Sequence, residues 1–177
     1  LQVAPIFGME TGDFNADGHL DLVMTGNWYA PNVRTVRLDA FVGAYLQGDG
    51  TGRFEVQDGT ESGFFVDGDA KATARVATGD GSSLVLTTQS SDSLRAFQPR
   101  GADSLRTINL RPLDQSAELQ FPNGETRRVG CYYGSSYLSQ SSRVLRVPSS
   151  VKRVVVTSST GERRTIFEQE RPTGAPE

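Results

Sequence analysis

The sequence predicts an all-β protein, with two repeated β units followed by a small antiparallel β domain of sandwich or barrel type. Short runs rich in β-branched residues, several of them alternating between apolar and polar, recur along the chain. Glycine, asparagine and aspartate separate these runs as turn residues. No stretch of ten or more residues shows the 3.6-residue period of an amphipathic helix.

The expected strands of the first part follow one another closely. A strand over residues 21–25 leads into a loop through Asn27-Trp28-Tyr29-Ala30-Pro31, and a longer strand is expected over 37–47. The glycine-rich run 48–52 turns the chain into a strand over 53–56. Because no Lys-Ser/Thr pair follows this run, it favours a hairpin turn over a phosphate loop. A further pair of strands is expected over 83–89 and 94–98.

The second part is expected to contain a strand over 105–110 and two hairpins. The first hairpin joins 117–121 to 127–132 around Asn123-Gly124, where both central positions of the turn tolerate positive φ. The second joins 151–158 to 163–167 around Thr160-Gly161. Cys131 lies in one of these strands and is expected to be a small buried apolar side chain.

A weak internal repeat organises the first part. The segment 17–25 aligns with 80–87 at an offset of about 62 residues, and the second copy lacks the residue that matches Asp21. Such an offset fits four-stranded units like propeller blades, although chance similarity around an Asp-Gly turn is the alternative. The pattern stops after Pro99. We therefore expect blade-like repeats over 1–100, a second β domain over 104–168 and a flexible tail over 169–177.

The composition excludes several classes of protein. Hydrophobic residues make up 36% and charged residues 22%, which is ordinary for a folded domain. The 18 Lys and Arg against 21 Asp and Glu form no basic block, so no nucleic-acid partner is expected. No apolar run reaches the length of about 20 residues that spans a bilayer, and no membrane insertion by this chain is expected.

The sequence contains few residues for catalysis by histidine or cysteine. His19 is the only imidazole and Cys131 the only thiol, which argues against Ser-His-Asp sites, disulfides and cysteine-based metal clusters. Acidic residues are plentiful, but their spacing singles out no pair of the kind glycosidases use. We predict that the chain is not an enzyme.

The strongest chemical signal is an acidic loop over residues 13–21. Oxygen-bearing side chains fall at its positions 1, 3, 5 and 9, with a glycine at position 6. This spacing is typical of loops that wrap several oxygens around calcium, a hard cation. The predicted ligands are Asp13, Asn15, Asp17, His19 through its carbonyl, and Asp21. The alternative is a plain Asp-Gly turn with solvated acids. The second copy has Val76, Thr78 and Asp80 at three of these positions and should bind no metal.

Two aromatic segments are candidates for ligand binding. The stretch 132–143 combines three tyrosines with many serines, and exposed aromatic faces beside hydroxyl groups suit glycan or peptide recognition. Tyr133 and Tyr137 are its candidate contact residues, and Trp28 is the candidate in the loop after the calcium strand. The alternative is that these aromatic side chains pack onto their own sheets.

These two segments carry a resemblance to known families. The run Gly12-Asp13-Phe14-Asn15-Ala16-Asp17-Gly18-His19-Leu20-Asp21-Leu22 resembles the FG-GAP/VCBS repeat, the calcium-loop blade of integrin-α-like β-propellers. The run Tyr133-Gly134-Ser135-Ser136-Tyr137-Leu138-Ser139-Gln140-Ser141-Ser142-Arg143 resembles the ASPIC/UnbV domain, which follows such repeats in large secreted proteins. Where that domain often has a Gly-Leu-Gly turn, this chain has Val147-Pro148-Ser149-Ser150, and only two blade-like units are present.

The resemblance implies a binding or adhesion module toward a protein or glycan ligand, with structural calcium and an extracellular, cell-surface or periplasmic location. The chain has no initiator Met, and we expect it to be a C-terminal piece of a larger exported repeat protein. The alternatives are an accessory part of a surface polysaccharide-processing enzyme and a purely structural propeller cap.

Overall fold

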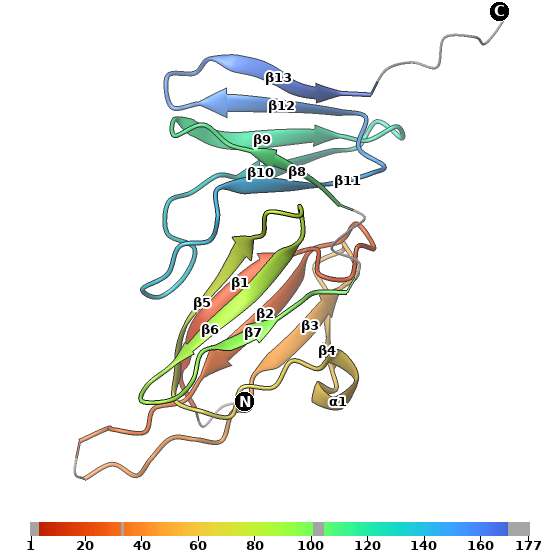
Figure 1. The fold of residues 1–177 in the computed structure, drawn as a ribbon. Helices are drawn as coiled ribbons and strands as arrows, with labels where there is room; N and C mark the ends of the chain where they lie inside the picture. The colour runs from red at the N-terminus through yellow and green to blue at the C-terminus, as the bar shows by residue number, and fades with distance from the viewer. Residues whose placement is uncertain (1–3, 33, 101–104, 170–177) are drawn as a thin grey trace, which may run out of the picture. The chain divides into compact units, whose positions relative to one another are not determined.

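The structure, a computed structural model, describes residues 4–32, 34–100 and 105–169. It confirms the all-β prediction, because antiparallel strands dominate and a single four-residue helix accompanies them in the described part (Figure 1). The described residues form four sheets, none of which closes into a barrel. The chain divides into two compact units, one made of residues 1–104 and 133–142, the other of residues 105–132 and 143–177.

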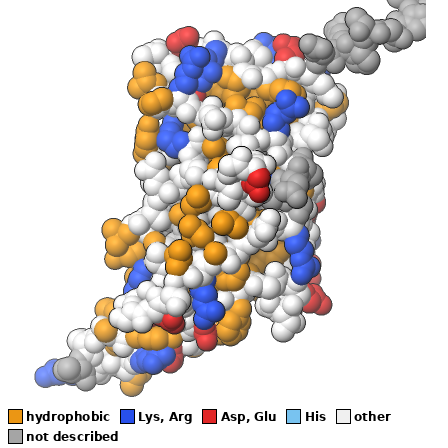
Figure 2. Space-filling view, in the orientation of Figure 1, with side chains coloured by type: hydrophobic (Ala, Val, Ile, Leu, Met, Phe, Trp, Pro, Cys, Tyr) orange, Lys and Arg blue, Asp and Glu red, His pale blue; other side chains and the backbone are white. Residues whose placement is uncertain are grey.

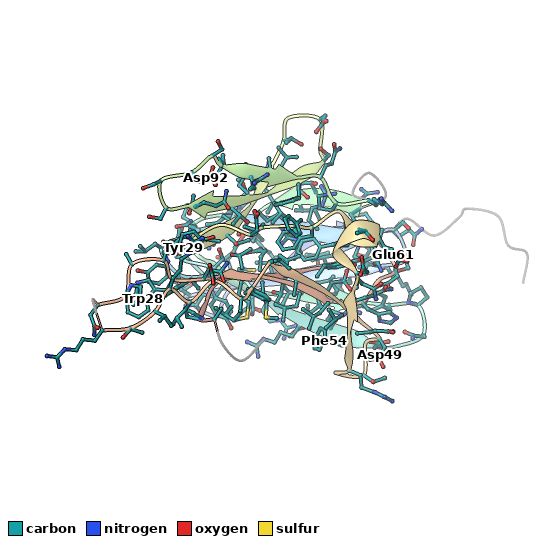
Figure 3. All side chains as sticks on the ribbon, turned by 90° about the horizontal axis from the view of Figure 1, so that it is seen from below. Trp28, Tyr29, Asp49, Phe54, Glu61 and Asp92 are labelled. Atoms are coloured by element: carbon teal, nitrogen blue, oxygen red, sulfur yellow. The ribbon has the colours of Figure 1, made fainter. Side chains whose placement is uncertain are left out.

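The first unit contains two sheets. The four-stranded sheet has the order β1-β2-β3-β4 and the three-stranded sheet the order β5-β6-β7. The elements of this unit are β1 (Ile6–Gly12), β2 (Asp21–Gly26), β3 (Ala44–Gly48), β4 (Phe54–Gln57), α1 (Gly59–Ser62), β5 (Ala70–Ala77), β6 (Ser83–Gln89) and β7 (Arg95–Phe97). Figure 3 shows the two sheets as separate layers, with α1 at one side.

The second unit contains a four-stranded sheet of order β10-β9-β12-β13 and a two-stranded sheet of β11 and β8. Its strands are β8 (Leu105–Asn109), β9 (Asp114–Gln120), β10 (Thr126–Gly130), β11 (Val144–Pro148), β12 (Arg153–Ser158) and β13 (Arg163–Glu168). The two expected hairpins are present, and Cys131 is a buried member of the core formed with Ala117, Leu119, Val147 and Val154, as predicted.

The core of the first unit lies between its two sheets. On β2, Val23 faces inward and is buried, and on β6 Val85 does the same, together with Phe14, Phe64 and Val66. The outward positions of β5 and β6 are also mostly small or apolar, and Figure 2 shows hydrophobic side chains gathered over these two strands. The outward face of these two strands is thus apolar, whereas several of their buried positions are polar, among them Thr73, Ser83 and Thr87.

One expected strand is wrong over most of its length. The strand expected over 37–47 is a strand only as β3, and the residues before it form a loop that projects from the sheets (Figure 1). The cause is the fully buried Asn27, whose carboxamide accepts from the Phe41 N–H at 3.0 Å and donates to the Phe41 carbonyl at 2.6 Å. Gly43 then turns the chain at φ 81°, which an extended strand does not allow.

Three strands were not anticipated, namely β1, β5 and β11. β1 and β5 carry glycine, alanine and charged residues in place of the β-branched runs that mark a strand. The segment 133–142, which the sequence assigned to the second domain, is counted with the first unit. Of the predicted tail, only Gln169 is among the described residues. The described part contains no helix with the length and apolar character needed to cross a membrane.

Candidate functional site

The acidic loop connects β1 to β2, and its own side chains hold its backbone in a tight coil. Asp13 Oδ2 accepts from the Gly18 N–H at 3.0 Å, and Asn15 Oδ1 accepts from the Asp17 N–H at 3.0 Å. Asp17 Oδ1 accepts from the His19 N–H at 2.8 Å. Gly18 has φ 90°, a left-handed conformation that glycine adopts without strain. The loop therefore turns Asp13, Asn15 and Asp17 toward one short stretch of backbone.

Asp21 differs from the other acids of the loop in its burial and in its hydrogen-bond partners. It is fully buried at the start of β2, and Oδ2 accepts from the Phe14 N–H and the Tyr45 hydroxyl, each at 3.0 Å. Its Oδ1 accepts from the Gly48 N–H at 3.0 Å. Both oxygens are thus engaged by the protein, and Asp21 ties the loop to β3. Its role as a metal ligand remains a prediction.

The loop also holds an oxygen that the protein leaves unsatisfied. Asp13 Oδ1 is buried and has no hydrogen-bond partner among the described residues. Likewise, no described residue donates to the His19 carbonyl, the backbone oxygen that the sequence assigned as a ligand. A buried carboxylate oxygen without a partner is costly, and a bound cation removes that cost. These oxygens, together with the carboxylate of Asp17, fit the hard-oxygen set that calcium requires.

The electrostatics of the loop are consistent with a place for positive charge. Burial raises the pKa of Asp13, the N–H groups of Gly18 and Ala16 oppose this, and the negative charges of Asp17 and Asp21 add to the rise. For Asp17, burial alone would raise the pKa, but hydrogen bonds from the His19 N–H, Asn15 and Gln47 bring it below its ordinary value. Asp13 is therefore the acid that a cation would relieve most.

The acids do not form a ready-made cage. In residues 4–32, 34–100 and 105–169, no three His, Cys, Asp or Glu side chains converge as a metal-binding group. Asp21 in particular is already engaged, because its carboxylate accepts from the Phe14 and Gly48 N–H groups and from the Tyr45 hydroxyl. The oxygens of Asn15 and His19, which are not acidic side chains, complete the predicted set.

The turn between β5 and β6 carries the residues that align with the acidic loop in the second copy of the repeat. Oδ1 of Asp80 accepts from the Thr78 hydroxyl and from the Ser82 N–H, the latter at 3.0 Å. The hydroxyl of Thr78 lowers the pKa of Asp80 most, with the groups of Ser82, to about 2. Asp80 thus has hydrogen-bond partners of its own, in contrast to Asp13 Oδ1.

The serines of segment 133–142 pack, while its tyrosines stay exposed. Ser136 Oγ accepts from the Met9 N–H of β1 at 2.8 Å, and Ser141 Oγ accepts from the Arg75 N–H of β5 at 2.8 Å. These hydroxyls satisfy the free edges of two strands, so part of the segment packs as the alternative interpretation held. Tyr133 and Tyr137 nevertheless keep 60% and 48% of their surface exposed.

The three aromatic candidates do not lie on one segment. The ring of Tyr137 packs against that of Phe7 on β1, with the ring centroids 5.4 Å apart and the planes tilted by 48°. Trp28 belongs to the projecting β2–β3 loop, where its backbone pairs with Leu38 and its ring is largely exposed (Figure 3). Beside it, Tyr29 donates to the Asp67 carbonyl at 2.7 Å and carries the guanidinium of Arg37 above its ring. The aromatic candidates therefore come from two different segments of the first unit.

Compared with models of known protein families and with curated protein sequences, the chain shows no match. The resemblance to FG-GAP/VCBS repeats and to ASPIC/UnbV domains stays a prediction that rests on the quoted residues. The sequence interpretation missed the structural roles of Ser136 and Ser141, for which a serine-rich run next to unpaired strands was the available signal. It also missed the polar residues that line a cavity in the first unit, because they come from separate segments.

Proposed function

We propose that this protein is a calcium-binding β module of an exported protein, and that it acts in binding or adhesion toward a protein or glycan ligand. The observation that carries the proposal is the buried, unpartnered Oδ1 of Asp13 in a loop with the spacing of calcium ligands. An extracellular, cell-surface or periplasmic location follows, since loops of this kind work where calcium is abundant.

The role proposed for calcium is structural. Bound calcium would supply the positive charge that offsets the carboxylates of Asp13 and Asp17. The chain's own residues shape and anchor the loop. Gly18 turns it, and Asp21 fixes its end to β3 through the Gly48 N–H and the Tyr45 hydroxyl. A fixed β1–β2 loop in turn holds the edge strand β1 in register with its neighbour β2 in the four-stranded sheet.

Thermal unfolding with calcium and with EDTA tests the proposal. Calcium that binds only the folded protein, at 100 times its Kd, adds about 2.7 kcal/mol and raises Tm by several degrees. Asp13→Asn should remove most of this increment. Asp80→Asn is the matched control, since it changes the equivalent turn between β5 and β6 and should keep the increment. Equal Tm values in calcium and EDTA for the unmodified protein would overturn the proposal.

A further inference from the structure

A cavity of about 570 Å³ opens between the two sheets of the first unit, and it is distinct from the aromatic candidates of the sequence. One wall comes from β2 and β3, the facing wall from β6 and β7, and α1 with the end of β4 forms the side. Figure 3 shows α1, with Glu61 on it, at the side of the two layers. The volume of the cavity falls in the range of about 300–1,000 Å³ typical of small-molecule sites.

The floor of the cavity is aromatic. Phe64 and Phe97 pack with ring centroids 4.6 Å apart, and Phe14 meets Tyr45 edge-on at 6.3 Å. Phe14 and Phe64 are buried, whereas Phe97 and Tyr45 remain partly exposed to the cavity side. The hydroxyl of Tyr45 is engaged with Asp21, so this residue offers a ligand its ring face. Such surfaces accept the C–H faces of a ligand.

The rim is made of neutral amides. Asn15, Gln47, Gln57 and Gln98 all line the cavity, and each carboxamide carries both donor and acceptor atoms. Gln47 donates from Nε2 to Asp17 Oδ2 at 3.2 Å, which leaves its carbonyl oxygen as an acceptor. The side chains of Gln57 and Gln98 have no hydrogen-bond partner among the described residues. Hydroxyl groups, which also donate and accept, are the natural partners of such a rim.

The charges at the cavity nearly cancel. Glu61 and Arg100 are the two ionised residues in its lining, they have opposite sign, and both are exposed. A phosphate or a polyanion would require clustered cations, and a cationic ligand would require more acids. The lining therefore favours a neutral ligand with several hydroxyl groups.

Local capping fixes the side wall. Asp58 caps α1 by accepting from the Thr60 N–H at 2.7 Å, and Gly63 ends the helix at φ 72°. The following Phe64 is buried in the core. A wall fixed in this way needs little reorganisation on binding, which preserves affinity for a small ligand.

We propose that this cavity binds a short neutral saccharide, whose C–H face lies on Phe97 and Tyr45 and whose hydroxyls bond to Gln47, Gln57 and Gln98. The inference rests on the proposed binding function and assigns it a place and a ligand class. It places the site in the cavity and not on the exposed Tyr133, Tyr137 and Trp28.

The test is a titration of the full, calcium-supplied chain with four neutral disaccharides, namely cellobiose, lactose, chitobiose and mannobiose. The readout is the side-chain amide resonances of Gln47, Gln57 and Gln98 in ¹⁵N-labelled protein, with Kd from the shifts. We expect at least one disaccharide to move all three amides. Gln57→Leu should weaken that disaccharide about 2- to 12-fold, the loss of one hydrogen bond. Gln115→Leu, an exposed glutamine of the second unit, is the matched control and should bind unchanged.

The outcomes separate this inference from the proposed function. If calcium raises Tm and no disaccharide moves the cavity amides up to its solubility limit, the saccharide inference is wrong and the calcium proposal stands. Shifts confined to the Tyr137 or Trp28 regions would also overturn it. If a disaccharide binds the cavity while calcium has no effect on Tm, the saccharide site stands and the calcium proposal is wrong. Thermal unfolding of Gln57→Leu serves as the folding control: a Tm close to that of the unmodified protein shows that a weaker affinity does not come from unfolding.

Discussion

The phenolic hydroxyl of Tyr45 on β3 donates to the carboxylate of Asp21 on β2 at a distance of 3.0 Å. Asp21 is fully buried, and it also accepts from the N–H groups of Phe14 and Gly48. Burial and the adjacent negative charge of Asp21 raise the pKa of Tyr45, so the hydroxyl keeps its proton and stays a donor. A buried carboxylate with three donors needs each of them, because an unmet lone pair in the interior is costly.

Replacing this donor should therefore destabilise the first unit. Tyr45→Phe keeps the ring against Phe14 and removes one hydrogen bond to a charged acceptor, at a cost of about 1.5–3 kcal/mol. Urea unfolding measures the change. Tyr132→Phe, at an exposed tyrosine, is the control and should stay within about 0.5 kcal/mol. Equal losses in the two variants would contradict the role given to Tyr45.

The serines of segment 133–142 give a second prediction. Ser136→Ala and Ser141→Ala each leave a strand-edge N–H, that of Met9 or Arg75, without its acceptor, and each should cost about 1–2 kcal/mol. The matched control lies in the same segment, since Ser139 Oγ is buried without a partner among the described residues. Ser139→Ala should be neutral or stabilising because it removes an unsatisfied polar group. If all three variants lose the same stability, the serines do not act as edge partners.

The sequence predicted the fold class because strand residues and turn residues alternate on a local scale. The strands it missed, β1 and β5, contact each other although they are distant in sequence. Their glycines and charged residues acquire a strand's environment only through this contact and through pairing with β2 and β6. The strand expected over 37–47 is shorter than predicted for a different reason. Its apolar residues look extended, but a single buried side chain, Asn27, captures Phe41 and holds the segment as a loop.

The internal repeat predicted two similar β units but not how they meet. Val23 and Val85 occupy matching positions in the aligned copies, and both point into the same core. The two sheets therefore meet through like faces. Rotation about a common axis, as in a ring of blades, would bring unlike faces together. A pattern within each copy carries no information on this choice, which depends on the packing between copies.

The spacing of the acidic residues predicted a tight local loop, but not the contacts that this loop makes with another strand. The spacing of Asp13, Asn15 and Asp17 reflects a turn closed by their own backbone bonds. Asp21 looks identical in the sequence, yet Gly48 and Tyr45 of another strand occupy its oxygens. The cavity could not be anticipated, because Gln47, Gln57 and Gln98 belong to three segments that only the fold brings together.

Glu10 and Arg75 form an ion pair that is largely buried. We expect the loss of Arg75 alone to destabilise the protein more than the loss of both charges. Their nearest charged atoms lie 3.8 Å apart, and Ser141 donates to Glu10 at 2.8 Å. Arg75→Met leaves a buried carboxylate without its cation and should cost about 3 kcal/mol near neutral pH. The double variant Arg75→Met with Glu10→Gln should recover a large part of that loss. Arg95→Met, which breaks an exposed pair with Asp67, is the control and should cost at most about 1 kcal/mol.

The free energies from urea unfolding of these variants measure the coupling. A double variant less stable than Arg75→Met alone would show that Glu10 contributes through something other than its charge.

The carboxylate of Glu10 should also make the free energy of unfolding depend on pH, in a direction that follows from its pKa. Burial raises the pKa of Glu10 above its ordinary value of 4.5, and the charge of Arg75 and the hydroxyls of Ser141 and Ser135 only partly offset it. Above pH 4.5 the folded protein therefore holds this proton more tightly than the unfolded chain. The linked stability is fully present below pH 4.5 and is lost as the pH rises through the folded pKa.

Glu10→Gln removes this titration and retains the shape of the side chain. We therefore expect the free energy of unfolding of the unmodified protein to fall, relative to that of Glu10→Gln, as the pH rises from about 4 toward 7. Urea unfolding across that range, in EDTA so that the acidic loop binds no metal, gives the two curves. Glu125→Gln, at an exposed hairpin turn, is the matched control and should run parallel to the unmodified protein. Parallel curves for Glu10→Gln as well would mean that burial does not raise the pKa of Glu10, and that the ion pair with Arg75 compensates its burial in full.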